Sequence, residues 1–230
     1  MLTTLLYFFV LQSNNLLVFN LNFNEFKNLL RFTLPVGLQE ICFPLYSFSL
    51  NYLIIMLLGN DYLGVYSAAI SFYIMFLFVP GILRNVILKH FSSKENSTIT
   101  KQAIILRQSI LINLALTIIP IILFVFSYKY IIYFLGDSYS DIQLLILPMS
   151  IMAIISSISN PLYQYYIAND KNWKLFLFRL SRDILTILLV YIVINYSFVS
   201  RLNSLTAIML LSAFTSAILF LLMFSEKNND

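Results

Sequence analysis

The chain has 230 residues, of which 60% are hydrophobic and only 10% are charged, and its mean hydropathy is +0.86. A soluble domain carries roughly 25% charged residues, so the composition excludes a soluble fold and predicts an integral membrane protein. The single cysteine, Cys42, excludes an internal disulfide and a cysteine-based metal cluster. The net charge of +4 is modest, and its distribution matters more than its size.

The elements expected along the chain are all membrane helices. Residues 1–23 begin with an apolar stretch too short to span, which we interpret as a partial or truncated hydrophobic segment rather than a signal-peptide core. Residues 24–225 predict an all-α, polytopic bundle of about six transmembrane helices in one lobe, and residues 226–230 predict a cytoplasmic tail. The six expected spans are 33–58, 63–88, 103–127, 142–166, 174–196 and 204–224.

The distribution of Lys and Arg predicts the orientation of these spans. When the segment before the first full span is placed in the cytoplasm, only Lys129 and Arg201 lie on the outer side. Such a bias favours that orientation and a cytoplasmic C-terminus. The twelve cations on the cytoplasmic side are Lys27, Arg31, Arg84, Lys89, Lys94, Lys101, Arg107, Lys171, Lys174, Arg179, Arg182 and Lys227.

The first span carries a polar stripe at helical spacing. Its members are Gly37, Glu40, Pro44, Ser47 and Asn51. Their intervals of three and four residues place them on one helix face, and Glu40 lies about a dozen ångströms past Arg31. Because lipid cannot satisfy such a face, we expect it to look at protein or at a water-filled cavity.

Two later spans repeat this pattern with small and polar residues. We expect these faces to pack against other helices, which small residues allow, or to line the same cavity. Asn51 of the first stripe and Gln164 of the stripe in the fourth span are candidate substrate ligands. The two faces consist of Ser109, Asn113, Thr117 and Pro120, and of Ser150, Ser157, Asn160, Pro161 and Gln164.

The fifth span supplies positive charge. Arg179, Arg182, Asp183 and Thr186 share one helix face, with Arg179 and Asp183 placed to pair across one turn. The alternatives are a topology signal with an internal ion pair, or the wall of an anion-attracting cavity, because a guanidinium binds phosphate through two parallel hydrogen bonds. Arg84, near the end of the second span, is a third candidate. His90, the only histidine, is expected to be solvated rather than a metal ligand or a catalytic base.

Four stretches carry a resemblance to a known family. They are "FKNLLRFTLPVGLQE" (26–40), "LGNDYLGVYSAAISFYIMFLFVPGIL" (58–83), "YFLGDSYSDIQLLILPMS" (133–150) and "LYQYYIANDKNWKLFLFRL" (162–180). Together they resemble the C-terminal lobe of the O-antigen and polysaccharide flippases, a branch of the superfamily that includes the multidrug and toxin extruders. Family members have two six-helix lobes facing each other across a central cavity, and this chain supplies one. Its "ILKHFSS" (87–93) also departs from the family's usual Leu-Pro-x-x-Ser.

The resemblance implies a transporter of the bacterial inner membrane rather than an enzyme. Its substrate would be an undecaprenyl-diphosphate-linked oligosaccharide, moved to the outer leaflet by alternating access. Arg84, Arg179 and Arg182 would then meet the diphosphate and sugar, and Glu40 and Asp183 would couple transport to H⁺ or Na⁺. We expect no other cofactor and no nucleic acid. The expected partners are membrane lipid, a missing N-terminal lobe and the glycan polymerase machinery.

Three other functions were weighed against this one. A cation-coupled multidrug extruder calls for several carboxylates in its cavity, whereas the spans hold only Glu40 and Asp183. A membrane enzyme of surface glycans calls for a large extramembrane loop or for a histidine beside a carboxylate. A non-functional fragment with no transport of its own is a further alternative, because the resemblance accounts for only one of the two lobes.

Overall fold

A computed structural model of the chain describes residues 23–93, 98–136, 139–196 and 201–229. Within these residues the chain forms seven helices and no strand. The predicted segment 1–23 lies outside the described residues except for Phe23. The helices are α2 (Phe23–Leu57), α3 (Asn60–Phe76), α4 (Phe78–Ser92), α5 (Ile99–Leu135), α6 (Ile142–Ala168), α7 (Asn172–Tyr196) and α8 (Arg201–Asn229).

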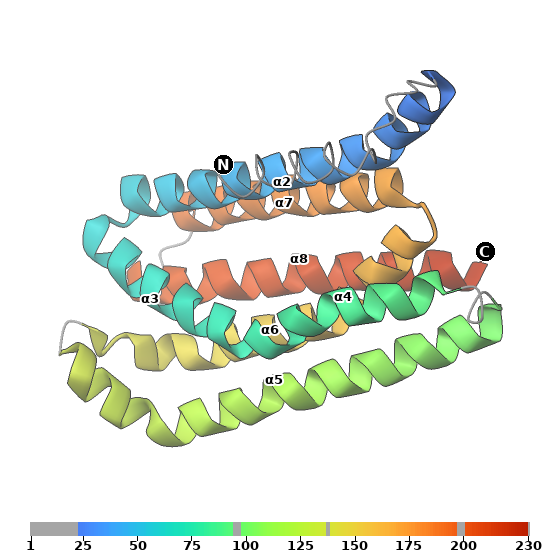
Figure 1. Cartoon of the computed structure of the whole chain (residues 1–230). Coiled ribbons are helices and arrows are strands. Elements are labelled where there is room, and N and C mark those ends of the chain that lie inside the picture. The colour runs from blue at the N-terminus through green and yellow to red at the C-terminus, as the bar shows by residue number, and fades with distance from the viewer. Residues whose placement is uncertain (1–22, 94–97, 137–138, 197–200, 230) are drawn as a thin grey trace, which may run out of the picture.

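The fold is an all-α, polytopic membrane bundle, as the composition predicts. Four described helices, α2, α5, α6 and α8, are long and apolar enough to cross a membrane, and the bent pair α3–α4 makes a fifth candidate. The fifth expected span, 174–196, corresponds to α7 (Asn172–Tyr196) and is not among them. It carries four charged residues, and it lies alongside α2 and α8 (Figure 1). Its status as a span therefore stays a prediction.

The second predicted span, 63–88, is broken rather than continuous. Helix α3 ends at Phe76 and α4 begins at Phe78, with a bend of 46° between them. Pro80 explains the break, because its ring nitrogen has no hydrogen to donate to the carbonyl of Phe76 and its ring crowds that carbonyl. The sequence pattern showed the proline but not that the two halves would separate.

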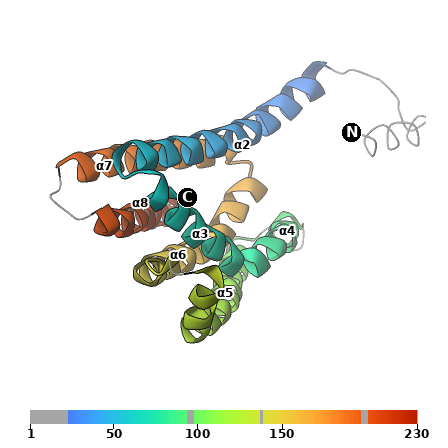
Figure 2. The ribbon, with the colours of Figure 1, turned by 90° about the vertical axis from the view of Figure 1, so that its left-hand side faces the viewer.

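Helix α6 is the centre of the bundle. It packs against α3, α4, α5, α7 and α8, while α2 packs chiefly on α7 (Figures 1 and 2). Viewed from the end, α2 and α7 form one side, α5 forms the other, and α6 and α8 lie between them (Figure 2). Fully buried Leu145, Met149 and Ala153 of α6 contact the core around Ile54 and Phe76. Because lipid is as apolar as these side chains, close packing rather than removal from water holds this core together.

The basic ends of the helices gather at one end of the bundle. There α2, α5 and α7 begin and α4, α6 and α8 end (Figure 1). Polar contacts tie α6, α7 and α8 together at this end. The Tyr166 hydroxyl donates to the Met223 carbonyl at 3.0 Å and to Glu226 Oε2 at 3.1 Å, and Lys174 forms an ion pair with Glu226 Oε1.

Candidate functional site

A cavity of about 340 Å³, with both polar and apolar side chains in its wall, lies inside the bundle. It is enclosed by α2, α3, α6, α7 and α8, and its rim includes Phe43 of α2 and Ile74 of α3, which are both more than half exposed. The residues that line it are Phe43, Tyr46, Ser47, Leu50, Asn51, Tyr66, Ser67, Ile70, Tyr73, Ile74, Leu77, Met152, Ser156, Ser159, Asn160, Tyr163, Arg179, Arg182, Thr186, Ser212 and Ser216.

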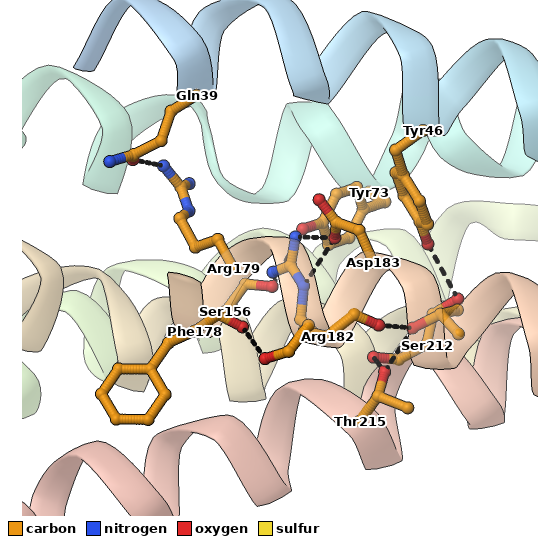
Figure 3. A network of polar contacts seen from close by, with 12 residues as sticks. Gln39, Tyr46, Tyr73, Ser156, Phe178, Arg179, Arg182, Asp183, Ser212 and Thr215 are labelled. Atoms are coloured by element: carbon orange, nitrogen blue, oxygen red, sulfur yellow. Dashed lines mark hydrogen bonds and ion pairs between the residues drawn. The ribbon is translucent and has the colours of Figure 1, made fainter. Parts of the chain in front are cut away.

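Two arginines one turn apart on α7 supply the charge of the cavity. Arg182 Nε and Nη2 both donate to Asp183 Oδ1, at 2.9 and 2.5 Å (Figure 3). The expected pair between Arg179 and Asp183 is wrong, because Asp183 binds its chain neighbour instead. Its carboxylate thus balances the charge of Arg182, and Asp183 itself is not among the residues that line the cavity.

Arg179 is held by neutral groups. Its Nη1 donates to Gln39 Oε1 of α2 at 2.8 Å, and its guanidinium lies over the Tyr163 ring of α6, 4.9 Å from the ring centre (Figure 3 shows the contact with Gln39). An amide and an aromatic face orient a guanidinium without neutralising it. Among the described lining residues there is no carboxylate, so the cavity carries a net positive charge that comes from Arg179.

Hydroxyl groups complete the polar part of the cavity wall. Tyr73 and Ser156 are hydrogen-bonded at 2.9 Å, and Tyr46 lies 3.5 Å from Ser212 (Figure 3). Each hydroxyl can both donate and accept, and each retains capacity for a further bond. Such groups suit a ligand rich in hydroxyls of its own.

The predicted site residues divide into two groups. Arg179, Arg182 and Asn51 line the cavity together. The others do not line it. Gln164 is buried in α6, Arg84 is exposed on α4, and Glu40 is exposed on α2. The functional roles assigned to all of these residues stay predictions.

The polar stripes also divide. Of the stripe on α2, Ser47 and Asn51 line the cavity, whereas Gly37, Glu40 and Pro44 are exposed. The first half of this face does not pack against the described residues, so the expectation that it faces protein or water stays a prediction there. Ser109, Asn113 and Thr117 of α5 are buried, and the Asn113 amide lies 3.5 Å from the Ser157 carbonyl of α6. The α5 stripe is a helix-packing face.

The sequence analysis missed Gln39 and the cavity tyrosines. Tyr66 and Tyr73 stand seven residues apart and so share a helix face, a signal that was available in the sequence. Tyr163 lies near the end of its expected span, where aromatic rings ordinarily favour the membrane interface, so its position does not mark it as a cavity residue. No local pattern marks Gln39, because its role depends on a contact with a helix 140 residues later.

The fold and cavity define a multi-pass membrane protein with a positively charged, hydroxyl-lined interior. The family of polysaccharide biosynthesis proteins matches residues 1–144, more than half of the chain. The chain belongs to this family, which indicates a role related to polysaccharide transport. No match was found among curated proteins or among solved structures.

Proposed function

We propose that the chain forms one lobe of a flippase that moves a polyprenyl-diphosphate-linked oligosaccharide across the bacterial inner membrane by alternating access. The observation that carries this proposal is the unneutralised Arg179 in a cavity inside a membrane bundle. A charge buried at membrane depth is expensive, and such residues commonly mark a substrate path. Membership of a polysaccharide biosynthesis family supports a glycan as the cargo.

The chemistry of the wall fits the two parts of such a substrate. A diphosphate needs a cation with several donors, and Arg179 offers these while Gln39 and Tyr163 fix its position. Gln39 does not itself line the cavity, and it acts by orienting the Arg179 guanidinium. The hydroxyls of Tyr73 and Ser156 suit the sugar.

The drug-extruder alternative has less support from the cavity. Coupling to a cation calls for a carboxylate that can reach the cavity, but Glu40 is exposed on the surface of α2 and Asp183 is bound to Arg182. An organic cation would also meet the charge of Arg179. As part of the proposal, the basic ends of the helices and the C-terminus lie in the cytoplasm, and a second lobe faces the cavity rim.

A binding assay on the detergent-purified chain tests the proposal. The probe is a farnesyl-diphosphate-linked disaccharide, compared with the same disaccharide lacking the phosphates. We expect the wild-type chain to bind only the phosphorylated probe. Arg179→Gln should weaken that binding by about tenfold or more, since a charge-assisted hydrogen bond contributes about 1.5–3 kcal/mol.

Arg107→Gln provides the matched control, because it removes the same charge from an exposed site on α5. It should leave the affinity unchanged. A parallel test in cells introduces Arg179→Gln into the bacterial gene and measures surface glycan by antibody or lectin staining, with membrane insertion checked by immunoblotting. Equal weakening by both substitutions, or normal surface glycan with Arg179→Gln, would overturn the proposal.

A further inference from the structure

A second hollow, of about 480 Å³, lies at the basic end of the bundle. The turn between α6 and α7, the first turn of α7 and the early part of α2 form its wall. It shares no lining residue with the candidate cavity. Its lining residues are Arg31, Phe32, Asp170, Lys171, Asn172, Trp173 and Lys174.

Positive charge dominates this hollow. Within the described residues, the cations Arg31, Lys171 and Lys174 and the carboxylate of Asp170 line it; Lys171 Nζ also lies over the Tyr166 ring, 5.9 Å from its centre, and Lys174 forms an ion pair with Glu226. The backbone holds the turn in place, since the Lys171 amide donates to the Tyr166 carbonyl at 2.9 Å. The first turn of α7 adds backbone N–H groups, which also favour an anion. The hollow is thus suited to a phosphate group.

Asn172 adds a second feature to the hollow, a buried hydrogen-bond acceptor. This residue is only 2% exposed, its Nδ2 lies 3.5 Å from the Phe32 carbonyl, and its Oδ1 has no donor within the described residues. Buried acceptors are rarely left without a partner in native proteins. Because Asn172 lines the hollow, a ligand with a hydroxyl group can supply the missing donor once the amide turns toward it.

The position of the hollow points to a lipid as the occupant. Trp173 and Phe32 are both about two-fifths exposed beside the cations, and indole rings with basic residues are typical of the headgroup level of a membrane. The helix ends that form its wall lie at the basic end of the bundle (Figure 1). A molecule bound here can keep its acyl chains along the outside of α2 and α7.

We propose that this hollow binds the headgroup of an anionic phospholipid whose alcohol carries hydroxyl groups, as in phosphatidylglycerol. The phosphate lies between Arg31 and Lys171, and a headgroup hydroxyl donates to Asn172. A lipid bound in this way bridges the start of α2 to the start of α7, the two helices that carry Gln39 and Arg179.

Native mass spectrometry of the detergent-purified chain tests this proposal. The lipids added are phosphatidylglycerol, phosphatidylethanolamine and phosphatidylcholine, and inorganic phosphate is added alone in a separate arm. We expect phosphatidylglycerol to be retained about tenfold more tightly than phosphatidylcholine, which corresponds to one charge-assisted hydrogen bond. Inorganic phosphate should not compete at millimolar concentration. Equal stabilisation by phosphate alone would overturn the choice of a lipid.

Variants separate a specific site from general attraction to the basic end. Arg31→Gln/Lys171→Gln should abolish the preference, whereas Lys89→Gln/Arg107→Gln removes two exposed cations from α4 and α5 and should preserve it. Asn172→Asp is a second test that is compatible with folding, since Asp is favourable in the first turn of a helix. Its added negative charge should weaken phosphatidylglycerol retention. Identical loss in the two double variants, or unchanged retention with Asn172→Asp, would refute the site.

Discussion

Replacement of Asp183 by Asn tests whether the Asp183 carboxylate neutralises Arg182 beside the cavity. In the native chain Asp183 Oδ1 accepts two hydrogen bonds from Arg182, and the two side chains are only 10% and 18% exposed. Asp183→Asn keeps the shape of the side chain but removes its charge. Arg182 is then left as an unbalanced cation inside the bundle.

The structure sets the magnitude of the loss. Two unit charges about 4 Å apart attract by about 4 kcal/mol at an effective dielectric constant of 20. Removing one partner of a buried pair costs about 3–5 kcal/mol in measured cases. Lys174 and Glu226 provide an internal comparison, because their side chains are 53% and 25% exposed. An exposed pair contributes about 0–1 kcal/mol.

A double-mutant cycle measures both pairs in the same protein. Unfolding by sodium dodecyl sulfate in mixed micelles can be followed through Trp173, the only tryptophan of the chain. We expect a coupling energy of at least about 2 kcal/mol between Arg182 and Asp183, and less than about 1 kcal/mol between Lys174 and Glu226. Asp183→Asn should also tighten binding of the farnesyl-diphosphate probe, because Arg182 becomes available to it. Equal coupling in the two pairs would refute the assignment of a buried, balanced pair.

Three further predictions concern the packing around the cavity. Tyr73→Phe removes the hydrogen bond to Ser156 and should lower the free energy of unfolding by about 0.5–1.5 kcal/mol in the same assay. Thr186→Val removes the 2.7 Å hydrogen bond to Thr215 and should cost about 0.5–1.5 kcal/mol, since Thr215 still donates to the Ser212 carbonyl at 3.1 Å; Thr186→Val/Thr215→Val should cost less than the sum of the two single changes. Pro80→Ala restores a backbone N–H donor and should straighten the bend between α3 and α4. Spin labels placed in the middle of each helix would then report a longer distance between the two labels. An unchanged distance would show that packing, not Pro80, causes the bend.

Much of the architecture follows from composition and helical spacing. Long apolar segments separated by short polar breaks can only form helices in lipid, and the bounds of α6 and α7 agree with the expected 142–166 and 174–196 to within two residues. For the arginines on α7 the spacing left open an internal ion pair or a cavity wall; Arg182 is paired with Asp183, and both arginines line the cavity. The helix bounds and the spacing of the arginines depend only on residues close together in the chain.

The features that the sequence did not reveal depend on contacts between distant helices. Arg179 was expected to bind Asp183, but it donates a hydrogen bond to Gln39 of the neighbouring helix α2 instead. Glu40 and Asn51 share a stripe, yet Asn51 lies at the cavity while Glu40 is exposed, because different stretches of α2 face different neighbours. A periodic pattern predicts which residues share a helix face. Only tertiary packing determines whether that face contacts another helix, a cavity or the exterior of the bundle.

The hydrogen bond between Gln39 and Arg179 has a mechanical consequence. It links α2 and α7, which already pack along each other, at the Arg179 guanidinium that lines the cavity. A ligand that pulls the guanidinium inward must either break this link or drag α2 with it. Under the proposed function, binding of a diphosphate to Arg179 would therefore pull on α2 through Gln39, so ligand binding and the position of α2 would be coupled.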